Sequence, residues 1–198
     1  ARGLKVADAQ LFDGAGSYRA PKVSTDPQAQ RFFEQAMVFG WGFNYPEAAR
    51  SFRAAAVRDP GCALCRWGIA WAVGPNINAD MEPAQLPIAR DALVQAKVYA
   101  TDARELAMVA ALTTRFPASG ETIGDAEARR YSEVMIALAD SRPEDADIAV
   151  LAAEALLVVS FSVPAVGGEG GNVVDLAPGT TISRAVAAGE THLFSTAL

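Results

Sequence analysis

The sequence is poor in the residues from which metal and redox sites are usually built. Its 198 residues include one histidine, His192, and two cysteines, Cys62 and Cys65. A structural zinc site needs four ligands, and a c-type haem needs His directly after Cys-x-x-Cys, where this chain has Arg66. The composition therefore disfavours both kinds of centre, and we expect no cofactor.

Basic residues and long apolar runs are also scarce. Seventeen Lys and Arg face 23 Asp and Glu, which gives a net charge of −6. An acidic chain without a basic stripe is a poor ligand for nucleic acid or for anionic lipid. No run reaches the roughly 18–20 apolar residues of a membrane helix, so we expect no transmembrane segment.

The compartment stays open from the sequence. The chain starts at Ala1, without Met and without the charged and apolar regions of a signal peptide, so it is a processed or trimmed form. Two cysteines fit oxidising and reducing surroundings alike. Periplasmic, secreted and cytoplasmic locations therefore all remain alternatives.

What the sequence does contain is a succession of segments with helical periodicity. Short Pro, Gly or Asn connections separate them, and cap residues such as Asp26 and Asp102, with Asp125 for the sixth, precede the apolar repeats. We expect helices over residues 27–39, 47–58, 63–73, 83–99 or 87–99, 103–115, 125–139 and 143–158. This pattern predicts an all-α fold of antiparallel helix hairpins.

The two ends of the chain break this pattern. Residues 1–25 are mixed and predict an extended arm, whereas residues 26–158 form the helical domain. Residues 159–198 are rich in Gly, Val and Pro, notably at 167–171, and we expect an irregular segment with a possible terminal helix.

One hairpin carries a specific repeat pattern. The tetratricopeptide repeat requires an aromatic residue and a small residue in its first helix, then Ala-x3-Phe-x2-Ala and a closing Pro in its second. These positions are filled by Phe32, Ala36, Ala48, Phe52, Ala55 and Pro60. The next hairpin matches only at Ile69 and Ala70, and later hairpins keep the helix lengths but lose the consensus.

A longer stretch resembles a bacterial family of tetratricopeptide-repeat (TPR-like) proteins. The segment SFRAAAVRDPGCALCRWGIAWAVGPNIN is similar to the family's D-P-x-C-A-x-x-x-W-G-x-A-x-A-x-G-P-N-I-N pattern, and the resemblance extends over residues 20–158. It implies a TPR-like superhelix, but the family brings no assigned activity. Family members continue into His-rich segments, and in this chain only THLFSTAL, which contains His192, is similar to them.

The repeat register indicates a binding surface. In a TPR superhelix the first helix of each hairpin lines the concave face, and Gly68 and Gly74 would leave room there for a ligand. Exposed aromatic residues on that face would form a binding platform. Alternatively the N-terminal arm, a later helix or a second subunit fills the groove, and the arm then imitates a bound peptide. The register places five side chains on this face, namely Phe33, Met37, Trp41, Trp67 and Trp71.

Other candidate residues keep two interpretations each. Asn76 and Asn78 either bond a ligand backbone or cap the helix break through Asx-type bonds. Cys62 and Cys65 are packing residues, a local disulfide, or a redox or metal site together with His192. Glu154 has the spacing of a solvated helix surface or, in its apolar context, pairs with an arginine.

Two hypotheses of function follow from these features. The first is a non-enzymatic binding or scaffold module that holds a peptide, a protein partner or a copy of itself in the aromatic groove, with Asn76 and Asn78 at its edge. The second is a metal-, cofactor- or redox-dependent enzyme that uses Cys62, Cys65 and His192. The scarcity of ligands and of carboxylate pairs favours the first.

Overall fold

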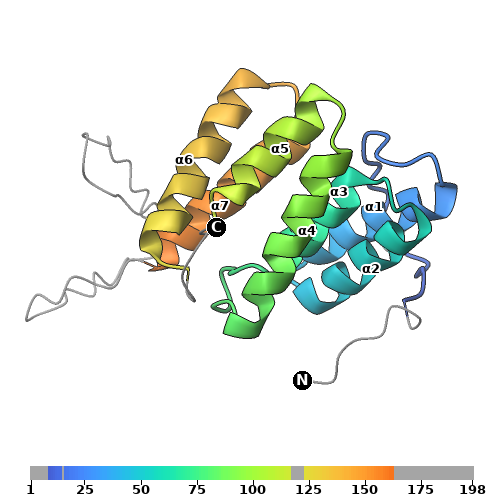
Figure 1. The fold of residues 1–198 in the computed structure, drawn as a ribbon, viewed down its shortest axis with the longest axis horizontal. Helices are drawn as coiled ribbons and strands as arrows, with labels where there is room; N and C mark the ends of the chain where they lie inside the picture. The colour runs from blue at the N-terminus through green and yellow to red at the C-terminus, as the bar shows by residue number, and fades with distance from the viewer. Residues whose placement is uncertain (1–8, 15, 117–122, 163–198) are drawn as a thin grey trace, which may run out of the picture. The chain divides into compact units, whose positions relative to one another are not determined.

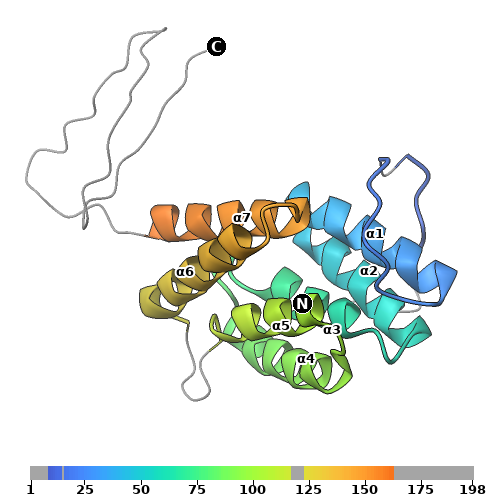
Figure 2. The ribbon, with the colours of Figure 1, turned by 90° about the horizontal axis from the view of Figure 1, so that it is seen from above.

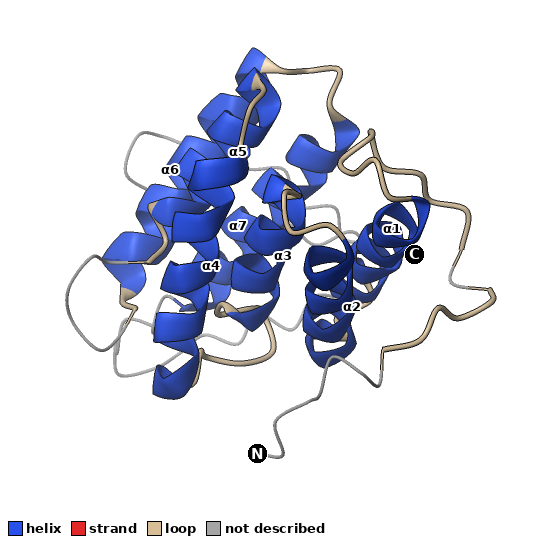
Figure 3. Ribbon diagram, turned by 45° about the vertical axis from the view of Figure 1, so that its right-hand side comes forward, coloured by secondary structure: helices blue, strands red, loops and turns tan. Residues whose placement is uncertain are grey.

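The fold of the described residues is entirely helical (Figures 1 and 3). The computed structural model describes residues 9–14, 16–116 and 123–162. Over these ranges the chain forms seven α-helices and one isolated bridge between Asn76 and Ala79. The helices are α1 (Pro27–Trp41), α2 (Tyr45–Arg58), α3 (Ala63–Val73), α4 (Leu86–Tyr99), α5 (Ala103–Thr113), α6 (Asp125–Ser141) and α7 (Ala146–Ser162), with a 3-10 turn at Pro83–Gln85.

The all-α prediction is thus confirmed for this part of the chain. Residues 1–159 form one compact unit, and the description below concerns that unit alone. Of the expected N-terminal arm, residues 9–14 and 16–25 are described, and they are not helical. The expected irregular segment lies, beyond Ser162, outside the described residues, as do the possible terminal helix and His192.

The predicted helix starts follow from side-chain caps. The Asp26 carboxylate accepts hydrogen bonds from the first-turn N–H groups of α1, and Asp102 does the same for α5. Asn44 caps α2, which begins at Tyr45, two residues earlier than expected. The prediction that Asp125 caps the sixth helix is wrong, because Gly124 is the N-cap and its N–H bonds the Glu127 side chain at 3.0 Å.

Successive helices pack against one another in chain order. Contacts join α1 to α2, α2 to α3, α3 to α4, α4 to α5 and α5 to α6. In addition α3 contacts both α1 and α5. Figure 2 shows α1 and α2 side by side at one end, with α3 between them and the pair α4 and α5. Neighbouring hairpins therefore share one continuous core.

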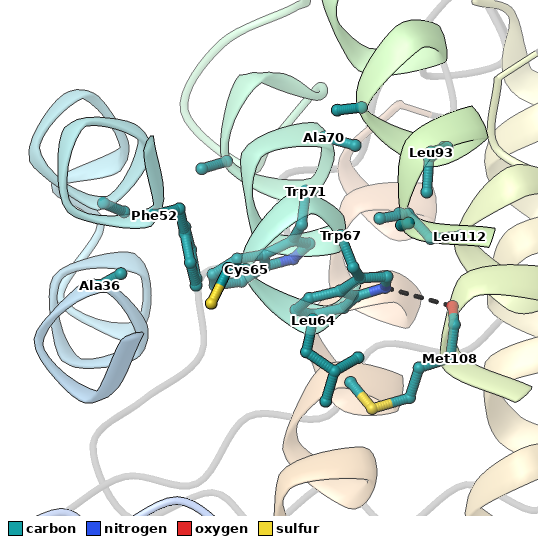
Figure 4. Packing of buried hydrophobic residues seen from close by; sticks show 14 of the residues in the cluster. Ala36, Phe52, Leu64, Cys65, Trp67, Ala70, Trp71, Leu93, Met108 and Leu112 are labelled. Atoms are coloured by element: carbon teal, nitrogen blue, oxygen red, sulfur yellow. Dashed lines mark hydrogen bonds between the residues drawn. The ribbon is translucent and has the colours of Figure 1, made fainter. Parts of the chain in front are cut away.

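Two glycines let large aromatic rings enter between α1, α2 and α3. A methyl group at Gly68 would lie 2.3 Å from ring carbons of Phe52, and one at Gly40 would lie 2.3 Å from the ring of Trp71. The two rings contact edge to face with centroids 6.3 Å apart (Figure 4). Gly68 therefore leaves room for Phe52 of the same chain, and its predicted role of leaving room for a ligand is wrong.

The alanines and phenylalanines of the repeat pattern are buried. Ala36, Ala48, Phe52 and Ala55 each have 0% exposure, and Phe32 has 2%. The alanines allow the helices to approach, and Phe52 fills the space between the first and second hairpins. The apolar periodicity of residues 32–60 thus reports a real core.

We expect Gly68→Ala to destabilise the protein. Overpacking against the buried Phe52 ring costs about 3 kcal/mol, whereas replacing a helical glycine returns about 1 kcal/mol, so the net loss is about 2 kcal/mol. Gly61→Ala is the control, because its methyl group would meet nothing closer than 3.4 Å. Urea unfolding followed by circular dichroism measures the stability of both variants. Equal stability would contradict the close contact between Gly68 and the Phe52 ring.

Candidate functional site

The side chains expected to line an open groove are interior. Phe33, Met37, Trp67 and Trp71 have exposures of 1–3%, and Trp41 is half-buried. The expectation that they form an exposed aromatic platform is therefore wrong in this structure. The register alone did not show that other parts of the chain bury these side chains.

Later helices cover the two tryptophans of α3. Trp67 and Trp71 stack with ring centroids 5.9 Å apart and planes 9° from parallel. The Trp67 indole N–H donates to the Met108 carbonyl of α5 at 3.2 Å (Figure 4). The Trp71 indole N–H donates to Glu154 of α7 at 3.5 Å. Both indoles are thus satisfied within the chain.

The described part of the N-terminal arm runs beside α1 (Figure 2) and packs on two of its aromatic residues. The Tyr18 ring meets the Trp41 ring edge to face at 4.6 Å, and the Phe12 ring meets Phe39 at 5.9 Å. Of the five residues expected to line the groove, Trp41 is thus contacted by the arm, and Trp67 and Trp71 are contacted by later helices.

Polar side chains of α1 hold the backbone of the arm. The Gln35 carboxamide accepts from the Phe12 N–H at 2.7 Å and donates to the Gln10 carbonyl at 2.9 Å. One helical turn earlier, Gln30 accepts from the Val23 N–H at 3.0 Å. Glu34 accepts from the Ala20 N–H at 3.3 Å. Since these bonds go to main-chain atoms, α1 holds the arm by its backbone on both sides of the turn at Asp13 and Gly14.

The arm is also tied to the start of α7. The Tyr18 hydroxyl donates to Asp147 at 2.9 Å, and Arg104 of α5 pairs with Asp147 at 3.2 Å and with Asp145 at 2.6 Å. Burial, together with the neighbouring Asp147 carboxylate, raises the pKa of Tyr18. Burial also raises the pKa of Asp147, against the opposing hydrogen bond from Tyr18. Tyr18 thus joins helices that lie far apart in the sequence.

A buried polar cluster lies beneath the loop after α3. Arg115 is 1% exposed, donates to the Pro75 carbonyl at 2.6 Å and lies 4.0 Å from Glu154. Of the two interpretations of Glu154, the solvated one is therefore wrong, and the structure shows the pairing with an arginine. Burial raises the pKa of Glu154, which Arg115 only partly opposes. Burial, with Glu154 nearby, raises the pKa of Tyr45 to about 12.

Several polar atoms of this cluster have no hydrogen-bond partner among the described residues. They are Nε and Nη1 of Arg115, the Tyr131 hydroxyl and Oε1 of Glu154. The Arg115 guanidinium lies over the Tyr131 ring, 4.9 Å from its centroid. Unsatisfied buried groups are costly, and they gather here at one place in the interior.

The loop that follows α3 borders an open pocket of about 430 Å³. Asn76 and Asn78 both line it, so the structure brings these two predicted residues together there. The Asn76 side chain accepts from the Asn78 N–H at 2.9 Å, which is the Asx-type bond of the structural interpretation. The other walls of the pocket come from α2 and the residue Phe43 before it, from the end of α3 and from the residues before α4. They include Phe43, Tyr45, Pro46, Ala49, Arg53, Val73, Asp80 and Glu82.

Among the residues of this pocket that sequence reasoning did not single out are Phe43 and Arg53. Phe43 is 54% exposed and has φ 61°, the left-handed region that glycine usually occupies. Arg53 is half-buried, and burial lowers its pKa. The Gly-Phe-Asn sequence was a signal for a helix end, but nothing local identifies which residue of it is strained.

The two cysteines form a disulfide, which was one of the three interpretations. Cys62 and Cys65 are bonded, and the Cys62 sulfur accepts the Cys65 N–H at 3.1 Å, where it caps α3. Both residues are at most 2% exposed. Within the described residues no group of three or more His, Cys, Asp or Glu side chains is arranged to hold a metal ion.

Comparison with models of known protein families, with curated proteins and with solved structures found no match. The family resemblance of the central segment therefore stays a prediction. Among the described helices none combines the length and apolar character that crossing a membrane requires.

We expect reduction of the disulfide to lower the free energy of unfolding by about 2 kcal/mol, the chain-entropy value for so short a loop. Helical content should not change, since the cysteines remain buried in the same core. Urea unfolding with and without a phosphine reductant measures the difference. The double variant Cys62→Ala and Cys65→Ala is the control, and a response to the reductant in that variant would contradict the assignment.

We expect Glu154 to make a pH-dependent contribution to stability. Its pKa is raised above the ordinary 4.5, so the folded chain binds this proton more tightly than the unfolded chain. Its contribution is fully present below the unfolded pKa and is lost as pH rises through the folded pKa. The stability of the wild type minus that of Glu154→Gln should therefore fall as pH rises above the ordinary pKa of 4.5.

Urea unfolding of both proteins at each pH measures this difference. Glu133→Gln, on the exposed side of α6, controls for the loss of one carboxylate from the surface. A difference between wild type and Glu154→Gln that stays constant or grows with pH would contradict the burial of an ionisable Glu154.

Proposed function

We propose that this chain is a non-enzymatic TPR-like binding module that holds an extended polypeptide segment along α1. The observation that carries the proposal is the set of bonds from Gln30, Glu34 and Gln35 to main-chain atoms of the arm. Recognition of this kind depends little on the bound sequence, because every residue except proline presents an N–H and a carbonyl.

The order of helix contacts supports the TPR-like part of the proposal. If α1, α3 and α5 are the first helices of successive hairpins, then α2, α4 and α6 are the second helices. Each first helix then contacts its own partner, the preceding second helix and the neighbouring first helix, as α3 does with α4, α2, α1 and α5. Repeat proteins are built from such nearest-neighbour contacts. Residues 48–60, which carry the second half of the tetratricopeptide pattern, lie on α2 and directly after it.

Two aromatic residues of the arm supply the sequence preference. Phe12 and Tyr18 pack on Phe39 and Trp41, and the Tyr18 hydroxyl bonds Asp147. A pocket of about 260 Å³ remains between the arm and α1, bordered by Phe12, Tyr18, Glu34 and Gln35. The α1 face therefore accepts a chain whose two aromatic side chains lie six positions apart, on either side of a turn, and has space beside it.

The arm is, in this proposal, an intramolecular occupant that a partner replaces. The partner is an extended peptide segment of another protein, or the arm of a second copy of this chain. In the second case the same contacts form between two copies, and the product is a homo-oligomer built by arm exchange.

The test weakens the arm in the full-length chain. In the variant Phe12→Ala with Tyr18→Ala we expect a labelled peptide of residues 9–23 to bind at least tenfold more tightly than it binds the wild type. The reason is that the tethered wild-type arm competes at an effective concentration of about millimolar. Fluorescence anisotropy measures the affinities, and equal affinities would contradict the proposal.

A further substitution in the same background tests the carboxamide contacts. Gln35→Leu removes two hydrogen bonds to the peptide backbone, which are worth about 2 kcal/mol together, so binding should weaken about thirtyfold. Gln28→Leu is the matched control, because Gln28 is exposed at the start of α1 and bonds Arg58 of α2. Its affinity for the peptide should equal that of the double variant.

A further inference from the structure

The pocket beside the loop after α3 is separate from the surface that holds the arm. None of its lining residues belongs to the arm or to the Gln30–Glu34–Gln35 set of α1. Its volume of about 430 Å³ is within the range of pockets for small ligands. A function of this pocket is therefore independent of the proposed peptide-holding role of α1.

Arg53 brings an uncompensated positive charge to the pocket. It is half-buried, and no hydrogen bond or ion pair joins its guanidinium to any residue that the structure describes. Its neighbour on the same helix, Arg50, pairs instead with Glu47 at 3.3 Å. A partly desolvated guanidinium with free donors is a ready partner for a carboxylate, which it can bind through two parallel hydrogen bonds.

Phe43 brings backbone strain to the rim of the same pocket. The Phe43 N–H bonds the Gly40 carbonyl at 3.0 Å, and the Asn44 N–H bonds the Phe39 carbonyl at 2.8 Å. These two bonds form a Schellman motif, whose left-handed position usually holds glycine. Here a phenylalanine occupies it with φ 61° and a half-exposed ring, although Gly42 precedes it directly. Strain of this kind gathers at ligand sites.

The remaining walls decide which anion fits. Pro46, Ala49 and Val73 give the pocket an apolar side. Asp80 and Glu82 also line it and repel a multiply charged anion such as phosphate more strongly than a singly charged one. A single carboxylate next to an apolar group therefore fits these walls better than phosphate.

We propose that this pocket binds the carboxylate of an apolar amino acid, either free or at the C-terminus of a peptide. The Arg53 guanidinium receives the carboxylate, and the Phe43 ring covers the apolar side chain. The Asn78 carboxamide, whose side chain makes no bond within the described residues, is placed to meet the adjoining amide or ammonium group.

Isothermal titration calorimetry with the full-length protein tests which class of ligand binds. The probes are L-phenylalanine, N-acetyl-L-phenylalanine, L-phenylalaninamide, the peptide acetyl-Ala-Ala-Phe and inorganic phosphate. The three carboxylates should bind at least tenfold more tightly than phenylalaninamide and phosphate. Tighter binding of the peptide than of phenylalanine identifies a chain terminus as the ligand, and the reverse order identifies a free amino acid.

Three variants connect this binding to the pocket. Arg53→Gln should weaken N-acetyl-L-phenylalanine at least tenfold, whereas Arg50→Gln, the matched loss of one charge on α2, should leave it unchanged. Phe43→Gly should weaken it about threefold to tenfold while raising the melting temperature, because glycine relieves the left-handed strain. If Phe43 had only a structural role, Phe43→Gly would not weaken binding while raising the melting temperature.

The proposal is overturned by any of three results. They are failure of every carboxylate to bind at about 10 mM, equal affinity for phenylalaninamide and N-acetyl-L-phenylalanine, and unchanged binding in Arg53→Gln that keeps its helical spectrum. The peptide of residues 9–23 gives an independent readout of the α1 face, so failure here leaves the arm experiment unaffected.

Discussion

The seating of two aromatic rings on two glycines fixes the rest of the structure. Phe52 lies against Gly68 and Trp71 against Gly40, each where a methyl group would come within 2.3 Å. These contacts set the separation of α1, α2 and α3, since no larger residue fits at either glycine. They also draw the tryptophans of α3 into the interior, so the face that a repeat module would offer to a partner becomes core.

Burying Trp71 creates a chain of polar requirements that leads back to the surface. Its indole N–H needs an acceptor, which Glu154 supplies, and the buried carboxylate in turn needs Arg115. Arg115 completes the chain by donating to the Pro75 carbonyl. Because a buried charge that loses its partner is strongly destabilising, this series ties the loop after α3 to the core and so positions the pocket that Asn76 and Asn78 border.

Local rules predicted the helices because their causes lie in neighbouring residues. The Asp26 and Asp102 caps and the closing Pro60 are examples, and most predicted boundaries agree with the structure to within a few residues. Exposure was not predictable in this way, because the periodicity of α3 identifies one face without identifying what covers it. The Tyr18–Asp147 bond spans 129 residues, and the absence of a partner for Arg53 among the described residues is likewise a property of the folded chain.

The two surfaces differ in how the chain satisfies its own polar groups, and this difference sets how each would bind. Along α1 the arm supplies the partners of Gln30 and Gln35, so a competing segment gains affinity only beyond the free energy that holds the arm. At the pocket Arg53 makes no hydrogen bond or ion pair with a described residue, and Phe43 keeps its left-handed backbone. A ligand there would displace no described segment, so its affinity would be reduced by its own loss of freedom and by the removal of water from the guanidinium and the carboxylate. A ligand of the pocket would therefore compete with water, whereas a ligand of the α1 face would have to bind better than the arm.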